Sequence, residues 1–445
     1  MANVSTVLED YHLWQPFTQM KTFLADHQII IERGEGPYLF DVNGKEYLNL
    51  TSCLWNVPLG LGRREIIDAI TEQLNTLAYS SLFRAGHTAA IELARLVAEI
   101  CPGQLDRVFF TSNGSESIET AVKIARRYFW QEQPRKHKVL SLKSAYHGVS
   151  YGALSASGFD DMKEGFGPLL PGFRQIEPPY CYRCPFGRTY PDCGVKCARA
   201  LEDAVLEEKP EQVALFLVEP VMGFGGVVVP PAEYFDIVTA ICREYEVLLA
   251  VDEVTTGFGR TGKMFAIEHW QAQPDIMALG KAMSAGYFPL GATVLTNDIW
   301  QRFIGPDDST RFEHGSTNSG HPGGCAAGRA TIELFRREGY VEKAARRGEF
   351  FLERLRELTD LPIVGDVRGL GMIFAVEFVR DKQTKEPLEA GAMAKLVEAC
   401  YVSGLWVHLS GNRIILLPPF ILDEDALDEA YRRLRQVITM AANWF

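Results

Sequence analysis

The sequence predicts an α/β protein with a mostly parallel sheet, and two observations support this fold class. Short runs that are apolar throughout, such as residues 214–218 and 247–251, are typical of parallel strands whose two faces are both covered. Segments with helical periodicity alternate with such runs, for example residues 64–77, 88–100 and 116–130. Strands that alternate with helices along a chain favour a sheet with helices on both faces.

Both ends of the chain predict further strands. Residues 38–41 and 47–50 flank an Asn-Gly pair, which tolerates the positive φ angles of a tight hairpin turn. Toward the C-terminus, residues 367–376 and 413–417 are predicted strands. A helix with an acidic first turn is predicted over residues 423–441, because acidic residues stabilise the start of a helix.

Composition argues against several classes of function. The chain has 445 residues, enough for roughly two or three domains, and 57 acidic against 45 basic residues give a net charge of −12. This acidic balance argues against a nucleic-acid partner, which usually requires a basic face. No apolar run approaches the roughly 20 residues of a membrane-spanning helix, and residues 1–10 lack the features of a signal peptide. We therefore expect a cytoplasmic protein without a membrane partner.

Two residues that follow apolar runs are the candidates for catalysis. Asp252 follows the run 247–251, and Lys281 follows the apolar residues 276–279. A carboxylate at the end of a covered strand needs a cation or a strong donor, and ligands bind at the carboxyl ends of such strands. Pyridoxal phosphate satisfies both residues, because its protonated ring nitrogen pairs with a buried carboxylate and a lysine amine holds its aldehyde. A helix cap or a structural ion pair is the alternative interpretation of Asp252.

The motifs around these residues resemble those of a known enzyme family. Asp-Glu-Val at residues 252–254 is followed by a glycine-rich segment, residues 257–262, then by Pro-Asp-Ile at 274–276 and Gly-Lys at 280–281. This order is similar to that of the class III, or omega, aminotransferases, which are pyridoxal phosphate enzymes of fold type I. The resemblance extends from Trp14 to the C-terminus.

The resemblance implies a large domain and a small domain. The large domain, residues 62–330, contains the mostly parallel sheet and binds pyridoxal 5′-phosphate. The small α+β domain is built from both chain ends, residues 1–61 and 331–445. The family also implies a homodimer in which the two subunits share their active sites.

By resemblance, the turn before the helix 116–130 holds the phosphate of the cofactor. A helix start presents free N–H groups and the positive end of the helix dipole, which suits an anion. Gly114 and Ser115 match the family's phosphate-binding positions, and Asn113 replaces the serine that usually precedes this glycine. Thr317 matches a threonine that donates to the cofactor phosphate of the neighbouring subunit. The alternative interpretation of the turn is a well-capped helix with no ligand.

The same resemblance assigns residues to the cofactor ring. Tyr146 stacks on the ring, and His147 supports it without binding a metal. Glu219, at the end of the run 214–218, lies near the ring oxygen or pairs with an arginine, and Val254 belongs to the motif that begins at Asp252. For Tyr146, the alternative is a buried tyrosine with a satisfied hydroxyl group.

Aromatic residues are predicted to make the substrate pocket narrow. Beside Tyr146, the resemblance assigns four of them to this pocket: Phe17, Trp55, Phe83 and Phe224. Phe83 lies in a segment that reaches the active site of the neighbouring subunit in the family, and Phe224 stands where relatives often have a smaller residue. A core anchor is the alternative interpretation of Phe17.

The residue that binds a substrate carboxylate departs from the pattern of many omega-aminotransferases. In those enzymes a mobile arginine before the last Pro-Pro pair binds acids, because a carboxylate requires a bidentate partner. Here His408 has that position, and histidine is a weaker carboxylate anchor. We therefore predict that Arg413 or Arg84 binds the acid, and that unbranched ω-amines or ω-amino acids are preferred to bulky ones.

The resemblance implies transamination from an ω-amino acid or a primary amine to a keto acid such as pyruvate. Lys281 moves the α-proton as general acid and base, while Asp252 keeps the cofactor ring protonated. One alternative is a diaminopelargonate-type aminotransferase, suggested by the Trp-x-Pro-Phe-Thr segment at residues 14–18. The others are a lyase, a decarboxylase or a racemase on the same scaffold, and a non-catalytic dimer.

Four of the nine cysteines have a spacing that resembles a zinc site: Cys181, Cys184, Cys193 and Cys197. The segment between the two pairs is short for a zinc ribbon or finger, and the loop is rich in proline. A similar loop occurs in taurine–pyruvate and related aminotransferases. We expect ordinary reduced thiols and no metal.

Overall fold

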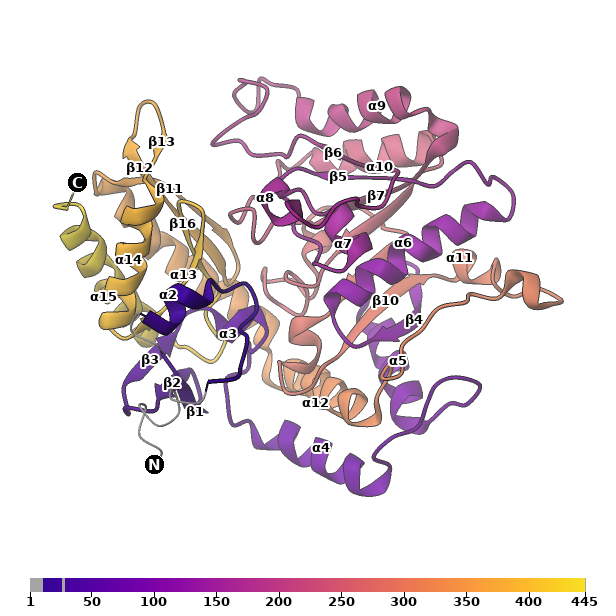
Figure 1. The fold of residues 1–445 in the computed structure, drawn as a ribbon, viewed down its shortest axis with the longest axis horizontal. Helices are drawn as coiled ribbons and strands as arrows, with labels where there is room; N and C mark the ends of the chain where they lie inside the picture. The colour runs from indigo at the N-terminus through magenta and orange to yellow at the C-terminus, as the bar shows by residue number, and fades with distance from the viewer. Residues whose placement is uncertain (1–10, 26–28, 445) are drawn as a thin grey trace.

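The computed structural model describes residues 11–25 and 29–444, which form a larger and a smaller part (Figure 1). Residues 1–10, on which the expectation about a signal peptide depends, lie outside the described residues. The larger part contains a seven-stranded sheet with the strand order β4-β10-β9-β8-β7-β5-β6. In that order the strands are Leu105–Thr111, Gly291–Thr296, Ile276–Leu279, Leu248–Asp252, Val213–Val218, Lys138–Leu142 and Phe173–Ile176.

Neighbouring strands of this sheet are parallel except at β10, which is antiparallel to β4 and β9. The prediction of a mostly parallel sheet is confirmed. Strand β8 shows why its residues are apolar throughout. Leu248 and Ala250 belong to the core that contains α6 (Gly114–Trp130), whereas Leu249 and Val251 belong to the core that contains α10 (Tyr234–Glu244). With helices on both faces, neither face of the strand meets water.

Other helices surround the sheet (Figure 1). They are α4 (Arg64–Thr76), α5 (Thr88–Ile100), α7 (Tyr151–Ala156), α8 (Asp160–Lys163), α9 (Lys196–Glu208), α11 (Asn297–Gln301) and α12 (Pro322–Glu338). Helix α12 packs against α4 and α5. The N-terminal segment adds α2 (Met20–Ala25) and the short α3 (Ser52–Trp55).

The smaller part contains both ends of the described chain, which lie on the same side of the molecule (Figure 1). Its first sheet has the order β1-β2-β3-β14, with bounds Ile31–Glu35, Tyr38–Asp41, Glu46–Asn49 and Leu405–Trp406. The parallel pair of β3 and β14 joins the N-terminal segment to the C-terminal one. A small α+β unit built from both chain ends is therefore confirmed. The domain boundaries themselves stay a proposal, and the one between residues 330 and 331 falls within α12.

The second sheet of the smaller part corrects one prediction. Residues 367–376 are not one strand but parts of the antiparallel strands β11 (Val364–Leu370) and β12 (Ile373–Asp381). Gly371 makes the turn between them with φ +58°, and a Cβ there would lie 2.2 Å from the carbonyl carbon of Thr261. The apolar pattern continues through the turn and therefore hides it. Elements that complete this part are β13 (Glu386–Pro387), β15 (His408–Ser410), β16 (Arg413–Leu416), α13 (Tyr340–Arg356), α14 (Ala390–Val402) and α15 (Glu424–Ala441).

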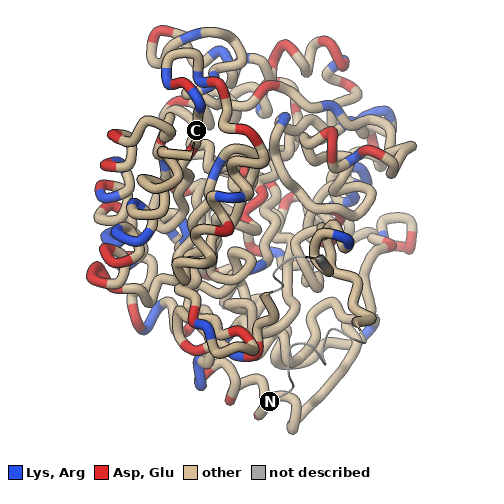
Figure 2. Tube along the Cα trace, turned by 60° about the vertical axis from the view of Figure 1, so that its left-hand side comes forward, with Lys and Arg blue, Asp and Glu red and all other residues tan. Residues whose placement is uncertain are grey.

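Charged residues are interspersed over the surface. On the side that Figure 2 shows, acidic and basic positions alternate along the outer helices and loops. Within residues 11–25 and 29–444, no helix combines the length and the apolar character that crossing a membrane requires.

Candidate active site

Lys281 lies at the carboxyl end of β9, at the start of a short 3-10 turn. Its Nζ donates a hydrogen bond to Thr255 Oγ1 at 2.8 Å and lies 5.3 Å from the centre of the Trp55 ring. Burial lowers the pKa of Lys281, although the negative charges of Asp252 and Glu219 partly oppose this shift. A lowered pKa makes the neutral amine more abundant, and the neutral amine is the form that acts as a nucleophile or a base.

Asp252 ends β8, the strand next to β9, and is 4% exposed. Its Oδ1 accepts a hydrogen bond from Val254 N at 3.0 Å, and its Oδ2 lies 2.8 Å from His147 Nδ1. We assign the proton of this pair to Nδ1, since a carboxylate can only accept. The buried Nε2 of His147 has no hydrogen-bond partner in the described chain. His147 therefore fixes the orientation of a carboxylate that lies close to the Lys281 amine.

Glu219 follows β7, on the other side of β8, and its carboxylate holds two backbone amides. Oε1 accepts from Tyr146 N and Oε2 from Gly223 N, each at 2.9 Å. Burial raises the pKa of Glu219 to about 7, with the charge of Asp252 adding to the rise and that of His147 opposing it. Glu219 thereby joins the loop after β5, which contains Tyr146, to the loop that follows β7.

The start of helix α6 has the features of an anion site. Asn113 is its N-cap: its side chain accepts from Glu116 N at 3.0 Å, and its carbonyl accepts from Ser117 N at 3.1 Å. The amides of Gly114 and Ser115 have no acceptor among residues 11–25 and 29–444. Free amides at a helix N-terminus bind phosphate well. Asn113, which departs from the family's serine, thus caps the helix while these two amides stay open.

Pyridoxal phosphate fits this group of residues. The open amides at the start of α6 suit its phosphate, and the buried carboxylate of Asp252 suits the positive charge of its ring nitrogen. The Lys281 amine suits its aldehyde. Three recognition groups from different segments therefore meet at one edge of the sheet, where the parallel strands end.

Aromatic rings form a wall beside Lys281. The Phe224 ring lies at the centre of this wall, with its centroid 5.5 Å from Tyr146, 6.2 Å from Trp55 and 5.2 Å from Phe159. His408 completes it, 5.8 Å from Phe224 and 5.2 Å from Trp55. Burial lowers the pKa of His408, and the charge of Lys281 lowers it further, so the imidazole is neutral near pH 7.

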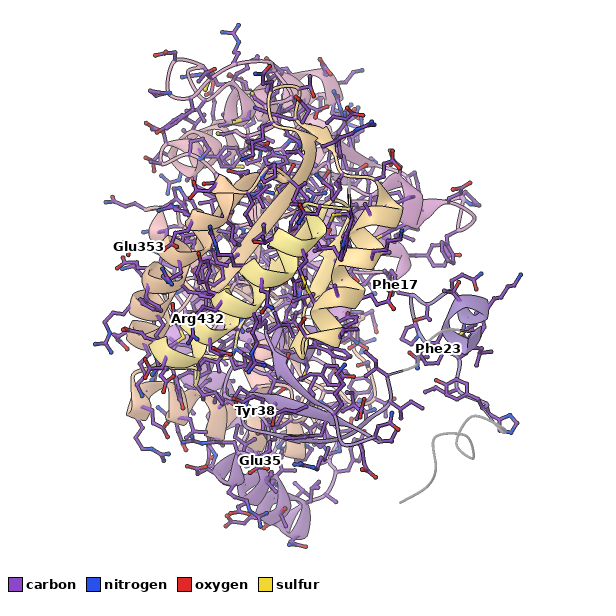
Figure 3. All side chains as sticks on the ribbon, turned by 90° about the vertical axis from the view of Figure 1, so that its left-hand side faces the viewer. Phe17, Phe23, Glu35, Tyr38, Glu353 and Arg432 are labelled. Atoms are coloured by element: carbon purple, nitrogen blue, oxygen red, sulfur yellow. The ribbon has the colours of Figure 1, made fainter. Side chains whose placement is uncertain are left out.

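Three predicted site residues do not join this group within one chain. Phe17 is 75% exposed and Phe83 is 61% exposed, and Thr317 is also exposed. Figure 3 shows Phe17 on a segment at the margin of the molecule. The segments of Phe83 and Thr317 nevertheless lie side by side, because Tyr79 Oη donates to Thr317 O at 2.8 Å.

The two arginine candidates for acid binding differ in their surroundings. Arg84 is exposed and has a positive φ of 66°. Arg413 is partly buried: its Nη1 donates to Gly225 O at 2.7 Å, and its Nε donates to Ser410 O at 3.2 Å. Arg413 is thus held by backbone carbonyls next to Phe224.

The four clustered cysteines line one narrow cavity, together with Tyr180 and Phe186. Burial raises the pKa of the Cys197 thiol to about 11, and neighbouring thiols contribute to the rise. In the described residues, no three His, Cys, Asp or Glu side chains are arranged so that they could hold a metal ion. The expectation of ordinary thiols stays a prediction.

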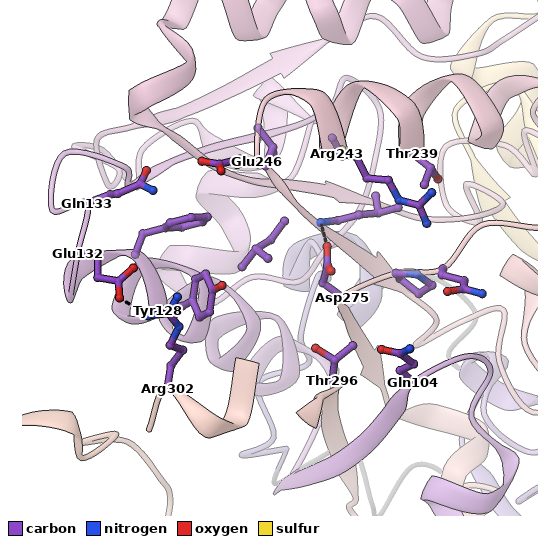
Figure 4. A pocket seen from close by; sticks show the side chains of 17 residues that line it. Gln104, Tyr128, Glu132, Gln133, Thr239, Arg243, Glu246, Asp275, Thr296 and Arg302 are labelled. Atoms are coloured by element: carbon purple, nitrogen blue, oxygen red, sulfur yellow. Dashed lines mark hydrogen bonds and ion pairs between the residues drawn. The ribbon is translucent and has the colours of Figure 1, made fainter. Parts of the chain in front are cut away.

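A separate cavity of about 490 Å³ lies at the opposite, amino-terminal ends of the strands (Figure 4). Val247 and Leu248 line it, and Asp275 Oδ2 accepts from Leu249 N at 2.7 Å there. Lys281 and Asp252 lie at the carboxyl ends of the same strands. This cavity is therefore separate from the catalytic candidates.

Sequence reasoning missed two residues of the site, Thr255 and Phe159. Thr255 directly follows the Asp-Glu-Val motif, and that proximity to Asp252 was the signal available. Phe159 lies in a loop that carries no motif, so its contact with Phe224 appears only in the folded chain.

Over residues 23–438 the chain matches the family described as aminotransferase class III. It is 39% identical to the adenosylmethionine-8-amino-7-oxononanoate aminotransferase of Geobacter sulfurreducens, over 94% of this chain and 93% of that protein. It is 34% identical to the putrescine–pyruvate aminotransferase of Pseudomonas aeruginosa, over 97% of this chain and 95% of that protein.

Solved structures agree with this assignment. The structure of an (S)-enantioselective omega-transaminase from Thermomicrobium roseum matches with a TM-score of 0.94 and 38% identity, over 98% of each chain. A PLP-bound amine transaminase from an uncultivated Pseudomonas species matches with a TM-score of 0.92 and 36% identity, over 97% of this chain and 98% of that one. The chain therefore belongs to the class III aminotransferases, which depend on pyridoxal phosphate.

Proposed function

We propose that this aminotransferase transfers the amino group of an unbranched primary amine or ω-amino acid to a keto acid, with pyruvate as acceptor. The observation that carries the proposal is the aromatic wall beside Lys281, in which Phe224 lies 5.5 Å from Tyr146. An apolar wall accepts the carbon chain of an amine, and its bulk leaves little room for a branched one. The similarity to a putrescine–pyruvate aminotransferase, which is named for an unbranched diamine, supports this donor class.

The residues of the site divide the chemistry between them. Bound pyridoxal phosphate supplies an electron sink for the bonds of the donor's amino carbon. Lys281 Nζ would take the proton from that carbon as a general base and, as a general acid, would deliver it to the former aldehyde carbon of the cofactor. Asp252, oriented by His147, stabilises positive charge at the ring nitrogen. Gly114 and Ser115 bind the phosphate, and Val254 packs against Gly114 at the same turn.

For the acceptor, we propose that Arg413 binds the carboxylate. Two of its nitrogens donate to carbonyls, which leaves Nη2 for a ligand. These two bonds hold Arg413 in place, in contrast to the mobile arginine that binds acids in many omega-aminotransferases. His408, on the neighbouring strand β15, is neutral and adds little charge, so binding of the acid depends on Arg413. Arg84 is the second candidate.

A screen of single amines with pyruvate tests the proposed function. We expect alanine to form from straight-chain amines such as 1-butylamine, and from ω-amino acids such as 4-aminobutanoate. Branched donors such as 1-phenylethylamine should react at least about 10-fold more slowly, as expected when a small loss of fit in a pocket costs 1–3 kcal/mol. Formation of another product without alanine would indicate a lyase or a decarboxylase. An unchanged cofactor spectrum with every amine would indicate a non-catalytic protein.

A second candidate function is diaminopelargonate-type transamination. Two observations favour it: the 39% identity to the Geobacter enzyme and the Trp-x-Pro-Phe-Thr segment at residues 14–18. S-adenosylmethionine with 8-amino-7-oxononanoate should then replace the amine–pyruvate pair. If kcat/KM for S-adenosylmethionine with 8-amino-7-oxononanoate exceeded that for every amine with pyruvate, diaminopelargonate-type transamination would be the function.

We further propose a cytoplasmic homodimer with shared active sites. Phe83 and Thr317 are exposed, and the segments around them adjoin each other through Tyr79. We expect sedimentation to show a dimer, and Thr317→Val to raise the Kd of the cofactor about 10-fold, because a hydrogen bond to a charged phosphate is lost. Thr359→Val removes the hydroxyl of another exposed threonine, which donates to Arg356 O, and serves as the matched control. A fully active monomer at low concentration would rule this proposal out.

A further inference from the structure

The loop that follows Glu219 and Pro220 carries Phe224, and we call its residues 223–226 the Phe224 loop. Its carbonyls accept hydrogen bonds from the smaller part of the molecule: Phe224 O from Ser410 Oγ, Gly225 O from Arg413 Nη1 and Gly226 O from Arg368 Nε, each at 2.7 Å. At its start, Gly223 N donates to Glu219. Every residue of the loop is therefore fixed by a side chain from elsewhere in the chain.

Arg368 is itself held by a buried carboxylate. Glu377 on β12 has a fully buried side chain, and its Oε2 lies 2.8 Å from Arg368 Nη2. Tyr180 and Arg183, from the loop before α9, also bond to Glu377. Arg368 Nη1 forms a further pair with Asp366 at 2.6 Å. The hydrogen bonds that Arg368 donates to Asp366 and to the Gly226 carbonyl are charge-assisted and therefore strong and directional, and the ion pair with Glu377 adds attraction without hydrogen-bond geometry. Arg368 thus has one defined orientation toward Gly226.

The Phe224 loop has little freedom to move away from these contacts. Gly226 has φ +110°, and a Cβ there would lie 2.7 Å from Arg413 Nη1 and 2.9 Å from Arg368 Nη2. Both guanidinium groups thus pack directly on the backbone of the loop. Phe224 then contacts Tyr146 and Trp55, and Trp55 lies over the Lys281 amine. A continuous series of contacts leads from Glu377 to the wall of the amine pocket.

We propose that Arg368 and Glu377 are positioning residues that set the donor selectivity of this enzyme, by holding the Phe224 loop so that the Phe224 ring narrows the amine pocket. The inference rests on the proposed function. The two residues touch neither substrate nor cofactor. They act through the Gly226 carbonyl, and Ser410 acts on the same loop through the Phe224 carbonyl.

The test compares an unbranched amine, 1-butylamine, with a branched one, 1-phenylethylamine. In Arg368→Met holoenzyme, kcat/KM for 1-phenylethylamine relative to 1-butylamine should rise about 10-fold, the effect of losing one hydrogen bond from a charged donor. Glu377→Gln should shift the ratio in the same direction, and Arg368→Lys should shift it less. Arg354→Met, which removes an arginine that pairs with Asp428 on the outer helices, should leave the ratio unchanged. If Arg368→Met lowered kcat/KM equally for both amines, its role would be merely structural and the proposal would be overturned.

A double-variant cycle tests whether the effect passes through the Phe224 ring. Phe224→Ala should raise the ratio by itself, and adding Arg368→Met in that background should change it less than about 2-fold, because coupled residues are not additive. If Arg368→Met raised the ratio in the Phe224→Ala background as much as it does alone, the proposal would be overturned. If Arg368→Met does not fold, Ser410→Ala replaces it, with the same expected direction. Calorimetry gives the dissociation constants of 1-phenylethylamine and 1-butylamine, and their ratio reports the selectivity of binding without turnover. An enzyme that binds the amines selectively but makes no alanine would contradict the proposed function and not this inference.

Discussion

Lys281→Ala should lower kcat about 10⁴-fold or more, because it removes the general acid and base and the anchor of the cofactor together. Burial lowers the pKa of Lys281, so the neutral amine is more abundant than in an exposed lysine, and the Thr255 hydroxyl cannot replace it. The substitution removes a side chain from the site without exposing a core, so we expect the fold to persist. Alanine formation from 1-butylamine and pyruvate gives kcat, and far-ultraviolet circular dichroism reports the fold.

Two other lysines serve as controls for this variant. Lys143 is exposed and pairs with Glu177, and Lys263 is exposed near the glycine-rich segment 257–262. Their replacement by alanine should leave kcat within about 2-fold, as is usual for surface positions. Retention of kcat by folded Lys281→Ala protein would show that another residue carries out the proton transfer.

Asp252→Asn should lower kcat about 10³-fold. The carboxylate is 4% exposed and is fixed by His147 and Val254, so a cation next to it gains a strong, water-free interaction. Losing one partner of a buried charge pair costs about 3–5 kcal/mol, which corresponds to about 10²–10⁴ in rate. A pH titration of the absorption spectrum of the bound cofactor should show its ring nitrogen losing a proton at a lower pH than in the wild type.

Asp275→Asn is the matched control. Asp275 precedes β9 at the opposite end of the sheet, where its carboxylate accepts from Leu249 N at 2.7 Å. Its replacement should weaken that contact and lower the melting temperature, but leave both kcat and the cofactor spectrum of the folded protein unchanged. An equal loss of kcat in the two variants would mean that Asp252 acts on stability alone.

Local sequence was sufficient to predict the parallel strands of the central sheet, whereas the roles of Asp252 and Lys281 required the resemblance to a family and stay a proposal. Residues 247–251 are apolar because both faces of β8 are covered, and such a run predicts a parallel strand. The carboxyl ends of parallel strands meet at one edge, so Asp252 and Lys281 were expected close together. At Gly114 the sequence alone predicted a strand, a turn and a capped helix, and only the resemblance added a role in phosphate binding.

Long-range contacts could not be predicted in this way. The partners that hold the Phe224 loop lie 142 to 188 residues away along the chain, and no local pattern marks Arg368 or Ser410. The hairpin of β11 and β12 was missed because the residues around its turn, from Leu370 to Ile373, are apolar or glycine and carry no polar turn signal. Phe83 and Thr317 are exposed in the single chain, so their place in a site shared with a second subunit stays a proposal.

Reduction of the cofactor-loaded protein with borohydride, followed by peptide mass mapping, tests the role of Lys281 most directly. Borohydride fixes the cofactor covalently to the lysine that holds it, and the added mass identifies that residue. We expect one modified peptide per chain, with the mass on Lys281. Label on Lys263 or Lys143 instead would contradict the assignment of Lys281, and with it the site built on β8 and β9.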